Sequence, residues 1–336
     1  MKRHTSSRII KVFGLILTAA SWGFLGHLCA QPDPIRIGMI GIDTSHATAF
    51  TEILNNPQSP EHVPGGKVVA AVKQFSPDIE SSISLVDGYV EKLKSEYGVR
   101  FFDTIEEMLP HVDAVMVESV DGRPHLNQAR PAIEAGKPTF IDKPMAASLR
   151  DVIEIFELAK KHGTPVWSAS NLRFHDGIVK AAATDVGELV SAFSWGPAPL
   201  EPHHPDLMWY GIHGVESLYT IMGTGCQTVS RVYTDGTDLV TGIWEGGRVG
   251  AVMGIRAARR GYGIKIFGTE TIIEEGAGGA YPQLLKEVIK FFRTGQVPVS
   301  PETTIELFAF MEAADESKRR GGAPVTIDEV MSRYGK

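Results

Sequence analysis

From residue 33 onward the chain alternates short apolar runs with segments whose apolar residues recur every three or four positions. The runs predict buried strands and the spaced segments predict amphipathic helices. Strands are expected at residues 35–41, 67–73, 112–118, 138–144 and 164–170. Helices are expected directly after the first strand, at 126–136 and at 149–163, where Gly163 ends the helix. This alternation predicts a Rossmann-type doubly wound parallel sheet.

The pattern changes after about residue 173. Gly-rich turns now separate strand-like runs such as GELVSAFSWG and QTVSRVYTDG, as in an antiparallel or mixed sheet, and helices are expected at 281–294 and 301–320. We therefore predict an α/β chain of 336 residues, long enough for two cores. Its expected parts are a Rossmann-type domain at 34–172, an α+β substrate domain with an open, mainly antiparallel sheet at 173–300, and C-terminal helices at 301–334.

The charge composition limits the classes of molecule that the protein is expected to bind. Lys and Arg number 33 against 40 Asp and Glu, which gives a net charge of −7. Such a chain has no general attraction for nucleic-acid phosphates or an anionic bilayer. We therefore expect a small-molecule partner and neither nucleic acid nor membrane.

Residues 1–30 have the pattern of a secretory signal peptide. Lys2, Arg3, Arg8 and Lys11 precede an apolar run that ends in Leu-Cys-Ala, a small-residue cleavage site. We expect cleavage after Ala30 and a periplasmic or secreted protein. An uncleaved membrane anchor is the alternative, which the Gly, Ser and His residues of the run weaken. The absence of an Arg-Arg pair points to the general export route, by which a chain crosses the membrane unfolded and without cofactor.

The stretch IRIGMIGIDTSHATAF at 35–50 has the form of a strand, a glycine turn and the start of a helix. In a dinucleotide-binding G-x-G-x-x-G loop the second and third glycines would stand where this chain has Asp43 and His46. Gly41 alone is in register, and a carboxylate at 43 would cost roughly 1 kcal/mol against two phosphates unless hydrogen bonds or a cation offset it. Thr44 and Ser45 can cap the helix and donate to an anion. We expect Rossmann geometry to persist here, with His46 facing the crevice.

The end of the second strand predicts the kind of dinucleotide. An acid that binds the ribose is expected there, but this chain has Lys73. A cation can hold a 2′-phosphate, so we expect NADP(H) rather than NAD(H). A solvated lysine at a strand end is the alternative interpretation.

Several motifs occur together in the order found in one known family. The first strand and turn are followed by EAGKPTFIDKPMAAS at 134–148, WYGIHGVESLYTIMG at 209–223 and GYGIKIFGTE. In this the mature chain resembles, over nearly its whole length, the glucose–fructose oxidoreductase, inositol dehydrogenase and rhizopine-catabolism (Gfo/Idh/MocA) family. Asp-Lys-Pro at 142–144 is similar to the Glu-Lys-Pro of that family. The resemblance implies a Rossmann domain followed by an open sheet, oxidation or reduction of sugars or polyols with NAD(P), and a homo-oligomer.

The same resemblance implies that Lys143 and His213 are catalytic. Lys143 follows a buried strand, where it could relay a proton from a substrate hydroxyl, or simply pair with Asp142. His213 and Glu216 share a helical face, which suits a base held by an acceptor, although a buried core histidine is the alternative. Where the family usually has an Asp, one turn before the histidine, this chain has Trp209, which either stacks on a sugar or belongs to the core.

Strand ends of a parallel sheet share one edge, so Asp43, Asp121, Asp142 and Lys143 are expected at one crevice. Cofactor contacts are predicted from Gly41, Asp43, Thr44, Ser45, His46, Lys73, Ser119, Asp142 and Lys143. Substrate contacts are predicted from Trp209, Arg173 and His125.

Two other functions stay open. One is a cofactor-free or metal-assisted lyase or hydrolase that acts on a carbohydrate through Asp43, His46, Asp121, His125 and Lys143. In the simpler interpretation the two aspartates are turn residues and the histidine caps a helix. The other function is sugar binding without turnover.

Two further clusters contain residue types that occur in binding sites. EPHHPD at 201–206 contains residue types that bind Zn²⁺ or Mn²⁺, but solvated histidines in Pro-rich loops are commoner, and no metal ligand is predicted. Arg256, Arg259 and Arg260 form a basic run near a strand end; such runs are mostly solvated, although one Arg could reach an acidic substrate.

Overall fold

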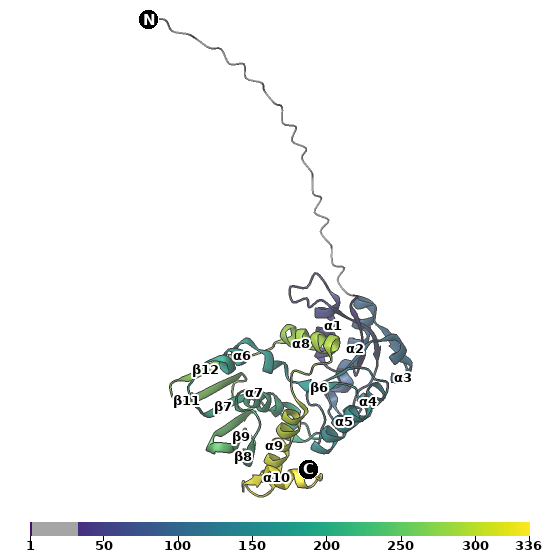
Figure 1. Ribbon diagram of the computed structural model, residues 1–336. Helices are drawn as coiled ribbons and strands as arrows, with labels where there is room; N and C mark the ends of the chain where they lie inside the picture. Colours follow the sequence, from purple (N-terminus) through teal and green to yellow (C-terminus); the bar gives the residue numbers. More distant parts are fainter. Residues whose placement is uncertain (2–32) are drawn as a thin grey trace. The chain divides into compact units, whose positions relative to one another are not determined.

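Two β-sheets organise the chain in the computed structural model, which describes Met1 and residues 33–336 (Figure 1). The expected signal peptide thus lies outside the described residues, apart from Met1. Within residues 33–336, no helix is long and apolar enough to cross a membrane.

The first sheet is parallel, with strand order β3-β2-β1-β4-β5-β6. Its strands are β1 (Ile35–Ile40), β2 (Gly66–Val72), β3 (Arg100–Phe102), β4 (Ala114–Val117), β5 (Thr139–Asp142) and β6 (Val166–Ala169). Its connecting helices are α1 (Ser45–Asn55), α2 (Glu80–Tyr97), α3 (Ile105–Met108), η1 (Leu109–His111), α4 (His125–Glu134) and α5 (Leu149–His162). The predicted doubly wound sheet is confirmed, and the strand order reverses between β1 and β4, where such folds place their ligands.

Successive residues of β1 face opposite sides of this sheet. Met39 belongs to one core, with Phe50 of α1, and Ile40 belongs to the other, with Val152 of α5. The helix α8 (Tyr281–Thr294) buries Leu284 against the α1 side. Residues that the sequence assigned to the second domain therefore complete the first one.

The second sheet is mixed, with order β12-β11-β7-β10-β9-β8-β13, and among these strands the pair β7 and β10 is parallel and the others antiparallel. Its strands are β7 (Leu189–Pro197), β8 (Cys226–Thr234), β9 (Thr237–Trp244), β10 (Val249–Ile255), β11 (Tyr262–Gly268), β12 (Ile272–Ala277) and β13 (Val325–Thr326). The remaining helices are η2 (Asn171–Phe174), α6 (Asp176–Ala183), η3 (Leu207–Gly211), α7 (Ile212–Met222), η4 (Glu245–Gly247), α9 (Pro301–Arg319) and α10 (Ile327–Ser332). The open, mainly antiparallel sheet is thus confirmed.

One apolar core runs from the first sheet to the second. It contains Val152 of α5, Leu218 of α7, Val252 of β10 and Phe308 of α9. Figure 1 shows α9 between α5 and the second sheet, and α7 along β7. Because close-packed cores deform little, this continuity fixes α7 and its histidine relative to the strand ends of the first sheet.

The turn after β1 keeps Rossmann geometry, as expected. Gly41 has φ of +82°, and a Cβ there would overlap the Ser119 hydroxyl and lie 2.5 Å from the Ser119 backbone nitrogen. Thr44 then caps α1, because its Oγ1 accepts a hydrogen bond of 3.0 Å from the backbone N–H of His46.

Candidate functional site

A cleft of about 510 Å³ lies at the carboxyl ends of β1, β4 and β5. The first sheet contributes the loop after β1, part of α2, and Lys143. The second half of the chain contributes η3, the start of β11 and the loop before it. The lining residues include Asp43, Thr44, Ser45, His46, Leu85, Tyr89, Lys143, Trp209, Tyr210, Arg260 and Tyr262.

The carboxylate of Asp43 is bound by the protein at the edge of this cleft. Asp43 is 1% exposed, and it accepts hydrogen bonds from Ser82 Oγ at 2.6 Å and from the Val120 backbone N–H at 3.0 Å. Burial raises the pKa of Asp43, and the two hydrogen bonds oppose that rise. The charge expected to repel a phosphate is therefore partly offset by these two donors.

His46 lines the cleft and is held from three sides. Its Nδ1 donates to Asp142 Oδ2 at 2.6 Å, and its ring lies 4.9 Å from both the Phe50 and Tyr281 rings, centre to centre. Burial opposes ionisation of Asp142, but the interactions with His46 and Lys143 outweigh it and lower the pKa of Asp142. Two residues of the predicted cofactor set therefore form a buried imidazole–carboxylate pair.

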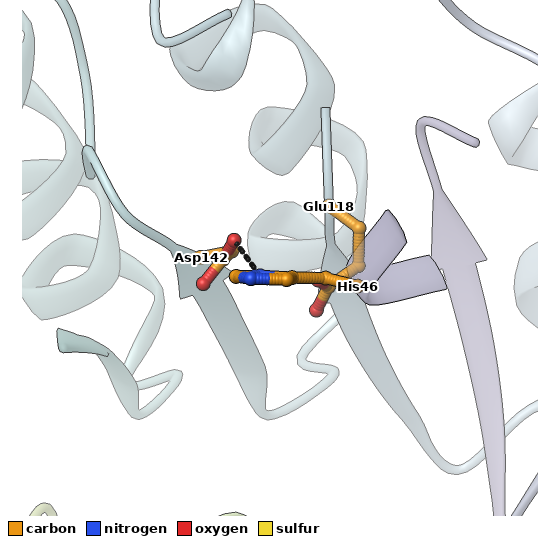
Figure 2. A group of neighbouring side chains, drawn as sticks. All are labelled: His46, Glu118 and Asp142. Carbon is orange, nitrogen blue, oxygen red and sulfur yellow. Dashed lines mark hydrogen bonds and ion pairs between the residues drawn. The ribbon is translucent and has the colours of Figure 1, made fainter. Parts of the chain in front are cut away.

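Glu118, directly after β4, completes this group. Figure 2 shows its side chain beside the joined His46 and Asp142. It is 0% exposed, and among the described residues neither of its carboxylate oxygens has a hydrogen-bond partner; Asp142 Oδ1 has none either. Burial and the negative charge of Asp142 raise the pKa of Glu118 well above its ordinary value, against the effect of Lys143. Glu118 is not among the residues predicted from the sequence, although a carboxylate within the apolar run VDAVMVESV was a usable signal.

Lys143 and His213 approach the same aromatic ring from different halves of the chain. Lys143 Nζ lies 5.0 Å from the centre of the Tyr210 ring, and the His213 ring lies 5.6 Å from it. Burial, together with the neighbouring Lys143 and His46, lowers the pKa of His213 well below its ordinary value. His213 is therefore a neutral imidazole at neutral pH.

The prediction that Glu216 holds His213 is wrong. His213 Nδ1 is 2.7 Å from Ser170 Oγ, whereas Glu216 accepts from the Ser170 backbone N–H at 3.2 Å and from Arg173 Nε at 2.7 Å. Arg173, expected at the substrate, is occupied by this ion pair and is not among the residues lining the cleft. Trp209 fits both roles considered for it, a core residue and a stacking surface for a sugar. It is largely buried beside His204, and it also lines the cleft.

Two other predicted contacts lie beneath the loop. His125 is fully buried, with Nδ1 2.9 Å from the carbonyl oxygen of Pro144 and Nε2 3.0 Å from that of Ser119, so the predicted substrate contact is wrong. Ser119 Oγ accepts from Gln128 Nε2 at 2.8 Å and abuts Gly41. Both residues support the turn from below.

Lys73 and Asp121 lie at a second cavity. Lys73 Nζ pairs with Asp87 at 2.6 Å, and Asp121 accepts from Ser76 Oγ at 2.6 Å and from the Arg123 guanidinium. Ser82 Oγ accepts from the Ser76 backbone N–H, so a chain of hydrogen bonds runs from Asp43 to Asp121. The expectation that Asp121 faces the same crevice as Lys143 is therefore wrong.

The EPHHPD residues do not converge on a metal site. Asp206 is bonded to Arg231 and Lys318, while His203 is exposed beside Glu201. In the basic run, Arg256 pairs with Asp238, and Arg260 reaches the cleft.

A family model described as an oxidoreductase family with an NAD-binding Rossmann fold, Gfo/Idh/MocA, matches residues 35–170. Inositol 2-dehydrogenase of Cereibacter sphaeroides is 30% identical over 145 residues, which are 42% of this chain and 38% of that protein. Inositol 2-dehydrogenase 3 of Saccharopolyspora erythraea is 28% identical over 172 residues, 50% of this chain and 44% of that protein. The chain thus matches about two fifths of the length of these curated relatives.

Solved structures share the fold along the rest of the chain. Myo-inositol 2-dehydrogenase from Lactobacillus plantarum has a TM-score of 0.74 at 16% identity, covering 88% of this chain and 99% of its own. Scyllo-inositol dehydrogenase from Lactobacillus casei, solved with NAD(H) and scyllo-inositol, has a TM-score of 0.73 at 17% identity, with the same coverage. The Gfo/Idh/MocA family model therefore matches the Rossmann domain, which contains the Asp-Lys-Pro motif, and the solved structures share the two-sheet fold of the described chain.

Proposed function

We propose that this protein oxidises or reduces a hydroxyl carbon of a sugar, polyol or glycoside, using a dinucleotide in the 510 Å³ cleft. The observation that carries the proposal is the approach of Lys143 and His213 to one ring, Tyr210, at the cleft. Carbohydrate-like substrates are proposed because the curated relatives are inositol dehydrogenases and one solved neighbour contains scyllo-inositol.

The loop after β1 fits the pyrophosphate of a dinucleotide. The Gly41 turn leaves no room for a Cβ, and Thr44 and Ser45 open the 11-residue α1, whose N-terminus favours an anion. Asp43 does not prevent binding, because two donors already engage its carboxylate. When bound, the dinucleotide supplies the acceptor for the two electrons that the substrate carbon loses.

The chain's own residues handle the proton and the substrate oxygen. Lys143, which lines the cleft, relays the proton of the reacting hydroxyl. Ser170 Oγ accepts from the Leu172 backbone N–H at 3.2 Å, and we assign the hydroxyl hydrogen of Ser170 to His213 Nδ1. The neutral imidazole then carries its hydrogen on Nε2 and donates from that atom, so His213 positions the substrate oxygen.

We further propose NADP(H) as the cofactor and a periplasmic or secreted location. Lys73 lies at the end of β2 in the second cavity, so this proposal requires the dinucleotide to extend there from the cleft; its ion pair with the 85% exposed Asp87 is worth only about 0–1 kcal/mol and would not prevent phosphate binding. The charged and apolar pattern before Ala30 supports export.

The experiment measures dinucleotide binding by calorimetry and turnover of an inositol and sugar panel by the absorbance of the reduced dinucleotide. Lys143→Met is expected to lower kcat by about 10²- to 10⁴-fold, the usual contribution of a proton-transfer group. The exposed Lys67→Met serves as the matched control and should keep full activity. Absence of binding of either dinucleotide, or full activity of the Lys143 variant, would overturn the proposal.

A carbohydrate lyase or hydrolase is the second candidate, favoured by the buried His46, Glu118 and Asp142 group next to the cleft. An enzyme of this second kind would convert its substrate without any dinucleotide. The same substrate panel, assayed without cofactor and analysed by mass spectrometry, separates the two functions.

A further inference from the structure

Two buried carboxylates next to the cleft lack sufficient partners. Both oxygens of Glu118 and Oδ1 of Asp142 are without hydrogen-bond partners in the described part of the chain. Leaving a carboxylate unpaired in the interior costs several kcal/mol, so buried acids are normally paired, hydrogen-bonded or bound to a metal. Lys143 does not fill the role, because within residues 33–336 it forms no ion pair with either acid and its Nζ lies over Tyr210.

The donor atoms already converge. His46, Glu118 and Asp142 each offer one ligand atom, and these atoms lie within 4.8 Å of one another (Figure 2). One imidazole nitrogen and two carboxylate oxygens are a donor set typical of divalent first-row transition metals. A dication would also balance the two negative charges of the acids.

The backbone holds these residues in place without a metal. Glu118 donates its backbone N–H to the Ile40 carbonyl at 2.7 Å, and Asp142 is the last residue of β5. His46 lies in the first turn of α1, between the Phe50 and Tyr281 rings. Ligands that rigid elements orient in this way lose little freedom when they bind an ion.

We propose that His46, Glu118 and Asp142 bind one divalent transition-metal ion of the Zn²⁺ or Mn²⁺ type. His46 lines the cleft, and three protein ligands leave a tetrahedral ion one coordination position short. A ligating nitrogen carries no hydrogen, so the ion displaces the hydrogen that joins His46 Nδ1 to Asp142, or uses Nε2 and keeps that bond. His46 is shared with the proposed dinucleotide cleft, but the test of metal binding requires neither dinucleotide nor substrate.

The test uses the full chain, stripped of metal with a chelator and titrated with ZnCl₂ or MnCl₂ by calorimetry. We expect one ion per chain, with Glu118→Gln and His46→Asn each weakening binding by more than about 10-fold. The matched controls are Glu306→Gln, in which a Glu bonded to the Gly225 and Cys226 backbone is changed, and His62→Asn, in which a His bonded to the Ile53 carbonyl is changed. Both controls should bind like the wild type.

Absence of one-to-one binding overturns the proposal, as does binding that survives both Glu118→Gln and His46→Asn. The ion would then lie elsewhere, for example at the exposed His203 and Glu201, and a proton on Glu118 would be what keeps the acids buried. Should the variants fail to fold, Co²⁺ loading of the wild type decides, because an ion in a four-coordinate protein site absorbs visible light much more strongly than a hydrated one. No dinucleotide or substrate is present, so this result does not depend on the redox proposal.

Discussion

His213 Nδ1 lies 2.7 Å from the hydroxyl of Ser170, a residue 43 positions earlier in the chain. Ser170 follows β6 of the first sheet, and His213 belongs to α7, which packs on the second. The bond therefore joins the two halves of the protein beneath Tyr210, which lines the cleft and packs on His213. In the tautomer proposed above, the Ser170 hydroxyl donates to Nδ1 and the neutral imidazole carries its hydrogen on Nε2.

Ser170→Ala is expected to lower kcat by about 10- to 100-fold, the usual range for a residue that orients a functional imidazole. KM should change less, because Ser170 is buried and is not among the residues lining the cleft. Ser170→Thr keeps the hydroxyl and should restore part of kcat, which a purely structural role would not require. Steady-state kinetics of the three proteins provide the measurement, and equal kcat values would contradict the positioning role.

Asp43→Ala is expected to destabilise the protein by about 1–3 kcal/mol, since it leaves the Ser82 hydroxyl and the Val120 N–H without an acceptor. Asp43→Asn keeps one acceptor oxygen and should lower the free energy of unfolding by less than Asp43→Ala. Urea denaturation followed by circular dichroism measures both. An Ala variant as stable as the wild type would show that the loop does not depend on this carboxylate.

The apolar pattern was sufficient for β1, β2, β4, β5 and β6, because both faces of each strand are buried. It did not predict β3, which has three residues, or α2, in which Ser82, Val86 and Leu93 are the buried positions of 18. Elements that bury so little leave too weak a periodicity to detect.

Residues of the candidate site were predictable from the sequence only where they belong to a recognisable motif. Lys143 was predicted from the Asp-Lys-Pro motif, and His213 from the helical motif at 209–223 that resembles the family. His46 was predicted from its position in the glycine loop. Ser170 was missed because its contact with His213 depends on how two sheets pack. Glu216 was assigned to the histidine from helical spacing alone, which could not show that Arg173 competes for it.

Lys73→Glu tests cofactor choice. If Lys73 holds a 2′-phosphate, reversing its charge should weaken NADP(H) binding by about 10-fold or more and leave NAD(H) binding nearly unchanged. Asp87→Asn frees Lys73 from its exposed partner and should strengthen NADP(H) binding slightly. Calorimetric titration with each dinucleotide measures the ratio, and equal weakening of both would assign Lys73 to general electrostatics.

The pH dependence of stability should reveal a proton held by Asp315. Arg231 is fully buried and binds Asp206, Asp238 and Asp315, while Lys318 also binds Asp206. Burial and the neighbouring charge of Asp206 raise the pKa of Asp315 to about 8, from an ordinary value of 3.8. Between these two values the folded chain holds a proton that the unfolded chain has lost.

The contribution of Asp315 to the free energy of unfolding should therefore decrease as pH rises from about 4 to about 8 and stay flat above that. Asp315→Asn cannot ionise, so the wild type should be more stable relative to this variant at about pH 5 than at about pH 9. Urea denaturation at both pH values measures the difference, and the exposed Asp328→Asn should show no such change. If the difference in unfolding free energy between the wild type and Asp315→Asn stays constant with pH, Asp315 is ionised in the folded protein. The number of charges would allow this, because the cluster has three cations, Arg231, Arg256 and Lys318. They face three acids, Asp206, Asp238 and Asp315.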